Sequence, residues 1–211
     1  MPKDIVVVVK NKLMSTDTVI PILIELKEKY NVSTLLITND EVAHKGINSN
    51  VVLRDAIKHV GKELYIGGGS SNKILKKIFK IRWFVFLLYK LSLGTKVLHF
   101  GIFHNFPYSI LARWFCRNLY FLQSDSFKHS YEKIVSLSKQ TLTVDIPISR
   151  NIVAFNDGMR HIDVLTDKHK LFMFGHTRTR GSWINYIKKR SDNYFYQYHR
   201  DVDLSNGCVV L

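Results

Sequence analysis

Short apolar runs alternate with longer amphipathic segments through most of the chain. Residues 5–9 form a β-branched run, IVVVV, which predicts a strand buried on both faces, as in parallel sheets. Residues 18–30 are expected to form a helix capped by Ser15 or Thr16, and residues 33–37 a second apolar strand. These segments predict a right-handed strand–helix–strand unit.

The alternation continues beyond this unit. The polar, Asn-rich residues 38–50 are interpreted as a loop, and residues 51–60 as a short helix. Further strands are expected at 64–66, 96–100, 119–122, 142–148 and 151–155, and further helices at 72–91, 107–117 and 127–139. Repeated alternation of strand and helix predicts an α/β fold with a doubly wound, mostly parallel, Rossmann-like sheet.

The pattern begins again in the last quarter of the chain. Residues 161–170 are polar and suggest a linker, followed by a strand at 171–174, a basic loop at 175–181, a helix at 182–190 and a last apolar run at 208–211. We therefore expect an N-terminal domain at 1–160 and the beginning of a second, nucleotide-binding α/β domain at 171–211. Because no helix follows the last apolar run, we expect the second domain to be truncated.

The positive net charge of the chain narrows the class of its binding partner. The formal net charge is +14 and the pI is about 9.8, which favours nucleic acid, an anionic membrane surface or a phosphorylated substrate. Residues 64–124 contain no Asp or Glu. Two cysteines without metal-like spacing suit a reducing compartment, and no apolar run reaches the ~20 residues of a membrane span. We expect a cytoplasmic protein that can lie on a membrane.

Four lysines share one face of the expected helix at 72–91, because they are spaced at i, i+3, i+4 and i+7: Lys73, Lys76, Lys77 and Lys80. A basic face that leads into an apolar second half is typical of a helix bound at an anionic membrane surface. The alternative is an ordinary sheet-covering helix with a solvated lysine edge.

Two residues are candidates for a catalytic base. His104 follows the strand at 96–100, and Asp157 follows the strand at 151–155, so both lie where ligands bind in open α/β sheets. Imidazole or carboxylate can remove a proton from an acceptor hydroxyl. Each also has a simpler explanation, a loop histidine bonded to backbone and an Asn-Asp-Gly turn. His99, inside its strand, is expected to be a core residue.

Two loops are candidates for binding phosphate. Gly68 and Gly69 lie between a strand and a helix, where free amides can hold an anion, although their spacing matches neither G-x-G-x-x-G nor the P-loop. Arg178 and Arg180 lie in the basic loop before a helix and suit a diphosphate. A tight turn and an exposed basic loop are the respective alternatives.

Three segments resemble the N-terminal half of a GT-B fold glycosyltransferase: IVVVVKNKLMSTDTVIPILIELKEKY, VLHFGIFHNF and LFMFGHTRTRGSWINYI. The likeness is to the bacterial surface-polysaccharide group, which includes capsule and teichoic-acid glycerophosphotransferases. It implies an acceptor domain followed by a nucleotide-binding domain, and it makes His104 the candidate base. The FNDG segment is similar to a strand end of sialyltransferase-like GT-B enzymes, which would give that role to Asp157.

The resemblance implies transfer from a nucleotide-activated sugar or polyol phosphate to a lipid-linked or glycan acceptor, peripheral to the inner membrane. Arg178 and Arg180 would then offset the charge of the leaving diphosphate. No cofactor and no metal are expected, since an inverting reaction needs none. The alternative is a non-catalytic α/β module whose basic window binds anionic membrane or nucleic acid, with nucleic acid the less favoured partner.

Overall fold

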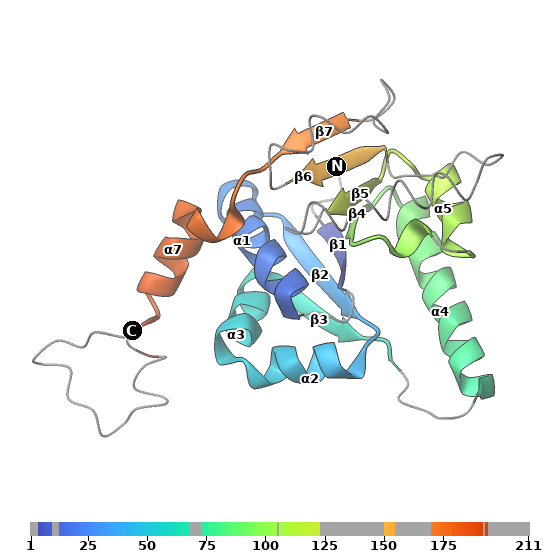
Figure 1. Cartoon of the computed structure of the whole chain (residues 1–211), viewed down its shortest axis with the longest axis horizontal. Coiled ribbons are helices and arrows are strands. Elements are labelled where there is room, and N and C mark those ends of the chain that lie inside the picture. Colours follow the sequence, from blue (N-terminus) through green and yellow to red (C-terminus); the bar gives the residue numbers. More distant parts are fainter. Residues whose placement is uncertain are drawn as a thin grey trace, which may run out of the picture.

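Seven parallel strands form one sheet in the part of the chain that the structure describes (Figure 1). This computed structural model describes residues 4–9, 13–67, 73–104, 106–122, 150–154, 170–191 and 193. The strands are β1 (Asp4–Val9), β2 (Ser33–Thr38), β3 (Gly61–Tyr65), β4 (Lys96–His99), β5 (Leu119–Leu122), β6 (Asn151–Ala154) and β7 (Lys170–Met173). Their order is β3-β2-β1-β4-β5-β6-β7. The expected α/β, doubly wound, Rossmann-like sheet is therefore confirmed.

The centre of the sheet is β1, which is buried on both faces. Val7 pairs with Leu36 of β2 and with Leu98 of β4. Alternate side chains point to opposite faces, so Val7 and Val9 join one hydrophobic cluster whereas Val6 and Val8 join the other. The uniform β-branched run at 5–9 thus supplies apolar side chains to both sides of the sheet at once.

Helices cover both faces. One layer contains α1 (Leu13–Tyr30), α2 (Glu41–Ser49), α3 (Val51–Val60) and α7 (Gly181–Lys188), whose apolar side chains share a cluster. The other contains α4 (Lys73–Ser92) and α5 (Tyr108–Trp114), together with the 3-10 turn η1 (Ile102–His104). A second 3-10 turn, η3 (Thr177–Thr179), precedes α7. Figure 1 shows α4 and α5 together on one flank and α7 on the other.

The expected loop at 38–50 is wrong, because most of it is helix α2. The Asp40 carboxylate caps that helix by accepting a hydrogen bond from the Ala43 amide at 2.8 Å. Ala43 and Ile47, one turn apart, are both buried, and Ile47 packs in the cluster that contains side chains of α1 and α3. Burial of this short apolar face therefore outweighs the low helix propensity of the surrounding Asn, Gly and Ser residues.

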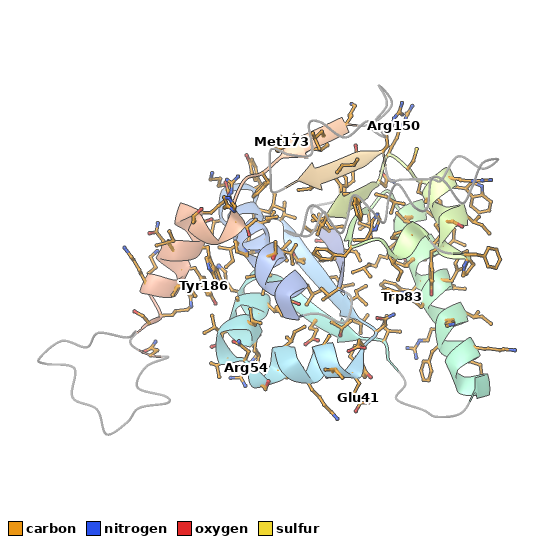
Figure 2. All side chains as sticks on the ribbon, viewed as in Figure 1. Glu41, Arg54, Trp83, Arg150, Met173 and Tyr186 are labelled. Carbon is orange, nitrogen blue, oxygen red and sulfur yellow. The ribbon has the colours of Figure 1, made fainter. Side chains whose placement is uncertain are left out.

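The strand that follows the expected linker belongs to the same sheet as the strands before it. β7 pairs with β6 in parallel, with Phe172 opposite Val153, and is the last strand of this sheet rather than the first of another. On α7, Tyr186 is 2% exposed and belongs to the same cluster as α1 and α3 (Figure 2). The expected elements at 127–139, 142–148 and 208–211 lie outside the described residues, as does most of the expected linker.

Helix α4 has two apolar faces. Trp83, Leu87 and Leu91 are buried in the cluster shared with β1 and α5, and Figure 2 shows Trp83 on the side of α4 that faces the sheet. Four large apolar side chains on the opposite face are more than half exposed: Ile78, Ile81, Val85 and Tyr89. None of the helices in the described part of the chain has both the length and the hydropathy of a membrane span.

Candidate functional site

The topological switch point lies at β1. The chain leaves β1 for β2 on one side, through α1, and returns past it from β3 to β4, through α4 on the other face. Connections after β1 and β4 therefore diverge at the carboxyl edge of the sheet, which is where open α/β sheets bind their ligands. The strand order places the candidate site beside the carboxyl ends of β1 and β4.

The turn after β4 is fixed by a buried histidine. His99 is fully buried, and its Nδ1 accepts a hydrogen bond from the Gly101 amide at 3.1 Å. The His99 ring meets the buried Phe103 ring edge-on, with 4.7 Å between centroids. Gly101 has φ 92°, a left-handed conformation that glycine adopts without strain. The expectation that His99 is a core residue is confirmed.

This turn positions His104 at the carboxyl edge. His104 ends η1, directly after the anchored Phe103, so its backbone lies just beyond β4. Its side chain is not among those that the structure describes. Asp157, Gly68 and Gly69 lie outside the described residues altogether. The roles of these four residues stay predictions.

The lysines in the first half of α4 lie on the same side of the helix as the buried residues in its second half. Lys80 precedes Trp83 by three residues, and Trp83, Leu87 and Leu91 follow at intervals of four, so all share one side of the helix. Lys80 is nevertheless exposed, because the first turns of α4 pass beyond the sheet. A crossover helix runs antiparallel to its strands, so these turns lie at the carboxyl edge (Figure 1).

Lys77 is also exposed, whereas the side chains of Lys73 and Lys76 are not described. The backbones of all four lysines lie in the first half of α4. Positive charge thus extends past the edge of the sheet on the side where the β4–η1 turn ends. This location suits a phosphate-bearing ligand as well as a membrane.

Arg180 contacts α1. Its guanidinium donates to the Glu25 carboxylate at 2.9 Å and to the Phe174 carbonyl at 2.8 Å, and it stacks on the Phe174 ring at 3.8 Å. The Glu25 pKa is lowered, first by the hydrogen bond from Lys29 and also by the charge of Arg180, against the opposing effect of burial. Arg180 therefore fastens the segment between β7 and α7 to α1.

The predicted arginine and lysine candidates lie on opposite faces of the sheet, since α7 packs with α1 and α4 packs with α5. Arg178 belongs to η3, next to Arg180, but its side chain is not described. The diphosphate role of both arginines stays a prediction.

A histidine–carboxylate pair at the same edge of the sheet was not predicted. His44 Nδ1 lies 2.8 Å from Glu63 Oε1, and the Thr38 hydroxyl donates to the same oxygen at 3.2 Å. The His44 ring stacks on Tyr65 with 4.4 Å between centroids. An ionised carboxylate can only accept, so Nδ1 is the donor in the contact with Glu63. A carboxylate that fixes the tautomer in this way produces a competent general base.

The signals for this pair were present in the sequence. Thr38 and Tyr65 are the last residues of β2 and β3, and Asp40 is a helix cap that places His44 one turn later. The pair was missed because residues 38–50 were interpreted as a loop and the third strand was placed at 64–66. Moving that strand to Gly61–Tyr65 puts Glu63 beside β2.

Among the residues whose side chains are described, no group of three or more His, Cys, Asp or Glu side chains is placed to hold a metal ion. Comparisons of this chain with protein-family models, with curated proteins and with solved structures find no match. The function therefore has to be inferred from the fold and the side chains themselves.

Proposed function

We propose that this protein is a transferase that moves a sugar or polyol phosphate from a nucleotide-activated donor to a hydroxyl of a lipid-linked or glycan acceptor. The reaction takes place at the cytoplasmic face of a membrane. The proposal combines the resemblance of three segments to GT-B glycosyltransferases with the chemistry available at the carboxyl edge of the sheet.

The observation that carries the proposal is the carboxyl edge beside β4. It combines a switch point between β1 and β4, a turn that ends at His104, and exposed lysines on the extension of α4. Residues 64–124, which include this turn and α4, contain no acidic residue that would repel phosphate. A switch point supplies the crevice, and uncompensated lysines supply attraction for a diphosphate group.

The transfer step needs a base and a means of stabilising the leaving group. In the proposed reaction, His104 or Asp157 removes the proton from the acceptor hydroxyl, and the oxygen attacks the activated carbon or phosphorus of the donor. The bond to the nucleotide breaks, and the nucleotide leaves with its negative charge. Basic side chains at the edge, among them Lys80, stabilise that charge. The His44–Glu63 pair is a third candidate base, supported by its geometry.

Donor binding and variant turnover test the proposal separately. Nucleotide-activated sugars and polyols should raise the melting temperature of the full chain, since a ligand that binds only the folded state stabilises it. Turnover with the best donor should fall at least about 100-fold in the variant that lacks the base. His104→Ala, Asp157→Ala and His44→Ala identify which residue that is. Turnover unchanged in all three variants would exclude this site.

A non-catalytic module that binds RNA, DNA or membrane through the same basic window is the rival function. It predicts no donor-dependent thermal shift. Tight, salt-sensitive binding to RNA or DNA without any response to nucleotide-activated donors would favour it over the transferase.

A further inference from the structure

The outer face of α4 carries a continuous apolar stripe. Ile78, Ile81, Val85 and Tyr89 follow one another at intervals of three or four residues, so they lie along one side of the helix. Each is between 53% and 64% exposed, although residues of this kind are usually buried. Trp83, Leu87 and Leu91 already supply the contact with the sheet from the opposite side. The stripe is therefore not needed for the core of the fold.

The same flank carries further exposed apolar side chains. Leu93 is 56% exposed just after α4, and Trp114 at the end of α5 is 68% exposed. Helices α4 and α5 are neighbours, since the rings of Phe84 and Tyr108 lie 6.1 Å apart between centroids (Figure 1). Phe106, two residues before Tyr108, is 81% exposed. Apolar side chains gathered on one flank in this way mark an interaction surface.

Basic residues border the stripe on both sides. Lys77 lies one turn before Ile81, and Arg82 lies next to both Ile78 and Val85 on the helix surface. Both basic side chains are exposed, and so are Arg113 and Arg117 in and after α5. No acidic residue occurs between residues 64 and 124, so none of this charge is neutralised from within the segment.

We propose that the outer face of α4 is the surface by which the protein binds an anionic lipid bilayer. The stripe Ile78, Ile81, Val85 and Tyr89 enters the boundary between headgroups and acyl chains, while Lys77 and Arg82 bind lipid phosphates on either side. Aliphatic side chains in a row with cations at the margins suit this boundary. Lys77 lies where the lysine face meets the stripe, whereas Lys80 is turned away from the stripe and remains free for the ligand at the carboxyl edge.

The positive charge on the outer face of α4 disfavours binding partners other than an anionic bilayer. A two-fold dimer through this face would bring the same Lys77 and Arg82 of two copies together, with no acidic residue on α4 or α5 to pair with them. Nucleic acid would use the cations and the Tyr89 ring but not the aliphatic side chains of the stripe, because bases stack on aromatic rings. An anionic bilayer is the partner that uses both features.

This proposal rests on the proposed function, because a lipid-linked acceptor is what the protein would reach by binding a bilayer. The test needs neither donor nor acceptor. The full chain is sedimented with vesicles of phosphatidylcholine alone, or of equal parts phosphatidylcholine and phosphatidylglycerol, at low and high salt. We expect binding to the anionic vesicles only, weakened by salt.

Two double variants test whether membrane binding occurs through this face. Lys77→Gln with Arg82→Gln should weaken binding about 25-fold, at about fivefold per charge. Ile81→Gln with Val85→Gln should weaken it about tenfold or more, because the stripe then no longer enters the bilayer. The matched controls lie on the other helix layer and its adjoining strand: Val42→Gln, and Lys58→Gln with Lys62→Gln. Val42 is 75% exposed, and we expect the controls to bind like the parent chain.

Three results would overturn the inference. One is failure of the parent chain to bind anionic vesicles. Another is equal loss of binding in the α4 variants and their controls, which would indicate attraction by net charge alone. The third is concentration-dependent dimerisation that the Ile81→Gln with Val85→Gln variant abolishes, since that would assign the stripe to a second copy of the chain. None of these results depends on whether the protein transfers a sugar.

Discussion

The two faces of α4 predict that truncating two similar side chains has very different effects on stability. Leu87 is fully buried against the sheet, whereas Ile81 is 64% exposed on the same helix. Leu87→Ala removes apolar contacts and leaves a cavity, so it should lower the free energy of unfolding by about 2–5 kcal/mol. Ile81→Ala exposes no new cavity and improves helix propensity, so it should change the free energy by less than about 0.5 kcal/mol.

Urea denaturation followed by tryptophan fluorescence measures both effects, because Trp83 lies in the same buried cluster as Leu87. The Leu87→Ala midpoint should fall with an unchanged dependence on urea, which indicates that the same surface is exposed on unfolding. Typical domains are stable by only about 5–15 kcal/mol, so the loss should be easily measured. Equal destabilisation by both variants would show that the outer face of α4 is packed, and the interaction surface would then not exist.

Three further predictions concern the packing around the sheet, and thermal or urea unfolding measures each of them. A Cβ at Gly61 would clash with the Thr34 carbonyl oxygen on β2, so Gly61→Ala should cost about 2 kcal/mol or more. An added Cβ at Gly181 would meet nothing within 4 Å, so Gly181→Ala should be neutral or slightly stabilising. Equal effects of the two substitutions would refute the close approach of Gly61 to β2. Arg180→Ala should cost about 1–2 kcal/mol by breaking its bond to Glu25, and a smaller loss in the Glu25→Gln background would confirm their coupling. The pKa of His59 is lowered, first by burial and next by the charge of Arg190, so the unfolded chain binds the proton more tightly. Stability should therefore be complete above pH 6.5 and fall on acidification below it, with His59→Gln removing that loss.

Most of the sheet could be predicted because most of its strands are short apolar runs separated by helices. The run at 5–9 has no polar residue, and only a strand buried on both faces uses such a pattern. The α/β class follows from that alternation. The strand order does not, because no local pattern specifies that β4 pairs with β1 while β3 lies at the edge.

Misinterpretations arose where local composition and tertiary packing disagree. Residues 41–49 contain Asn, Gly and Ser, yet burial of Ala43 and Ile47 makes them a helix. The strand at 170–173 was expected to begin a second domain, but it pairs with β6 at the edge of the first sheet. A strand that starts a new sheet and one that extends an old one have the same sequence pattern.

The candidate site was only partly predictable. The position of His104 beyond β4 follows from the strand and loop pattern. The His44–Glu63 pair instead depends on contact between α2 and β3, because its two residues lie 19 positions apart in the chain. The lysine spacing on α4 predicted one basic face, and the structure describes the side chains of two of its members, Lys77 and Lys80, both exposed. It could not reveal that this face continues the buried side of the helix, because exposure depends on where the sheet ends.

Transfer of label from donor to lipid is the most direct test of the proposed activity. The full chain is incubated with nucleotide-activated donors labelled in the sugar or polyol, together with a bacterial lipid extract, and the lipid fraction is counted. A transferase predicts donor-specific, time-dependent label in lipid and release of the nucleotide, both lost in the variant that lacks the base. Absence of label with every donor, together with no donor-dependent thermal shift, would contradict a transferase and leave a binding module.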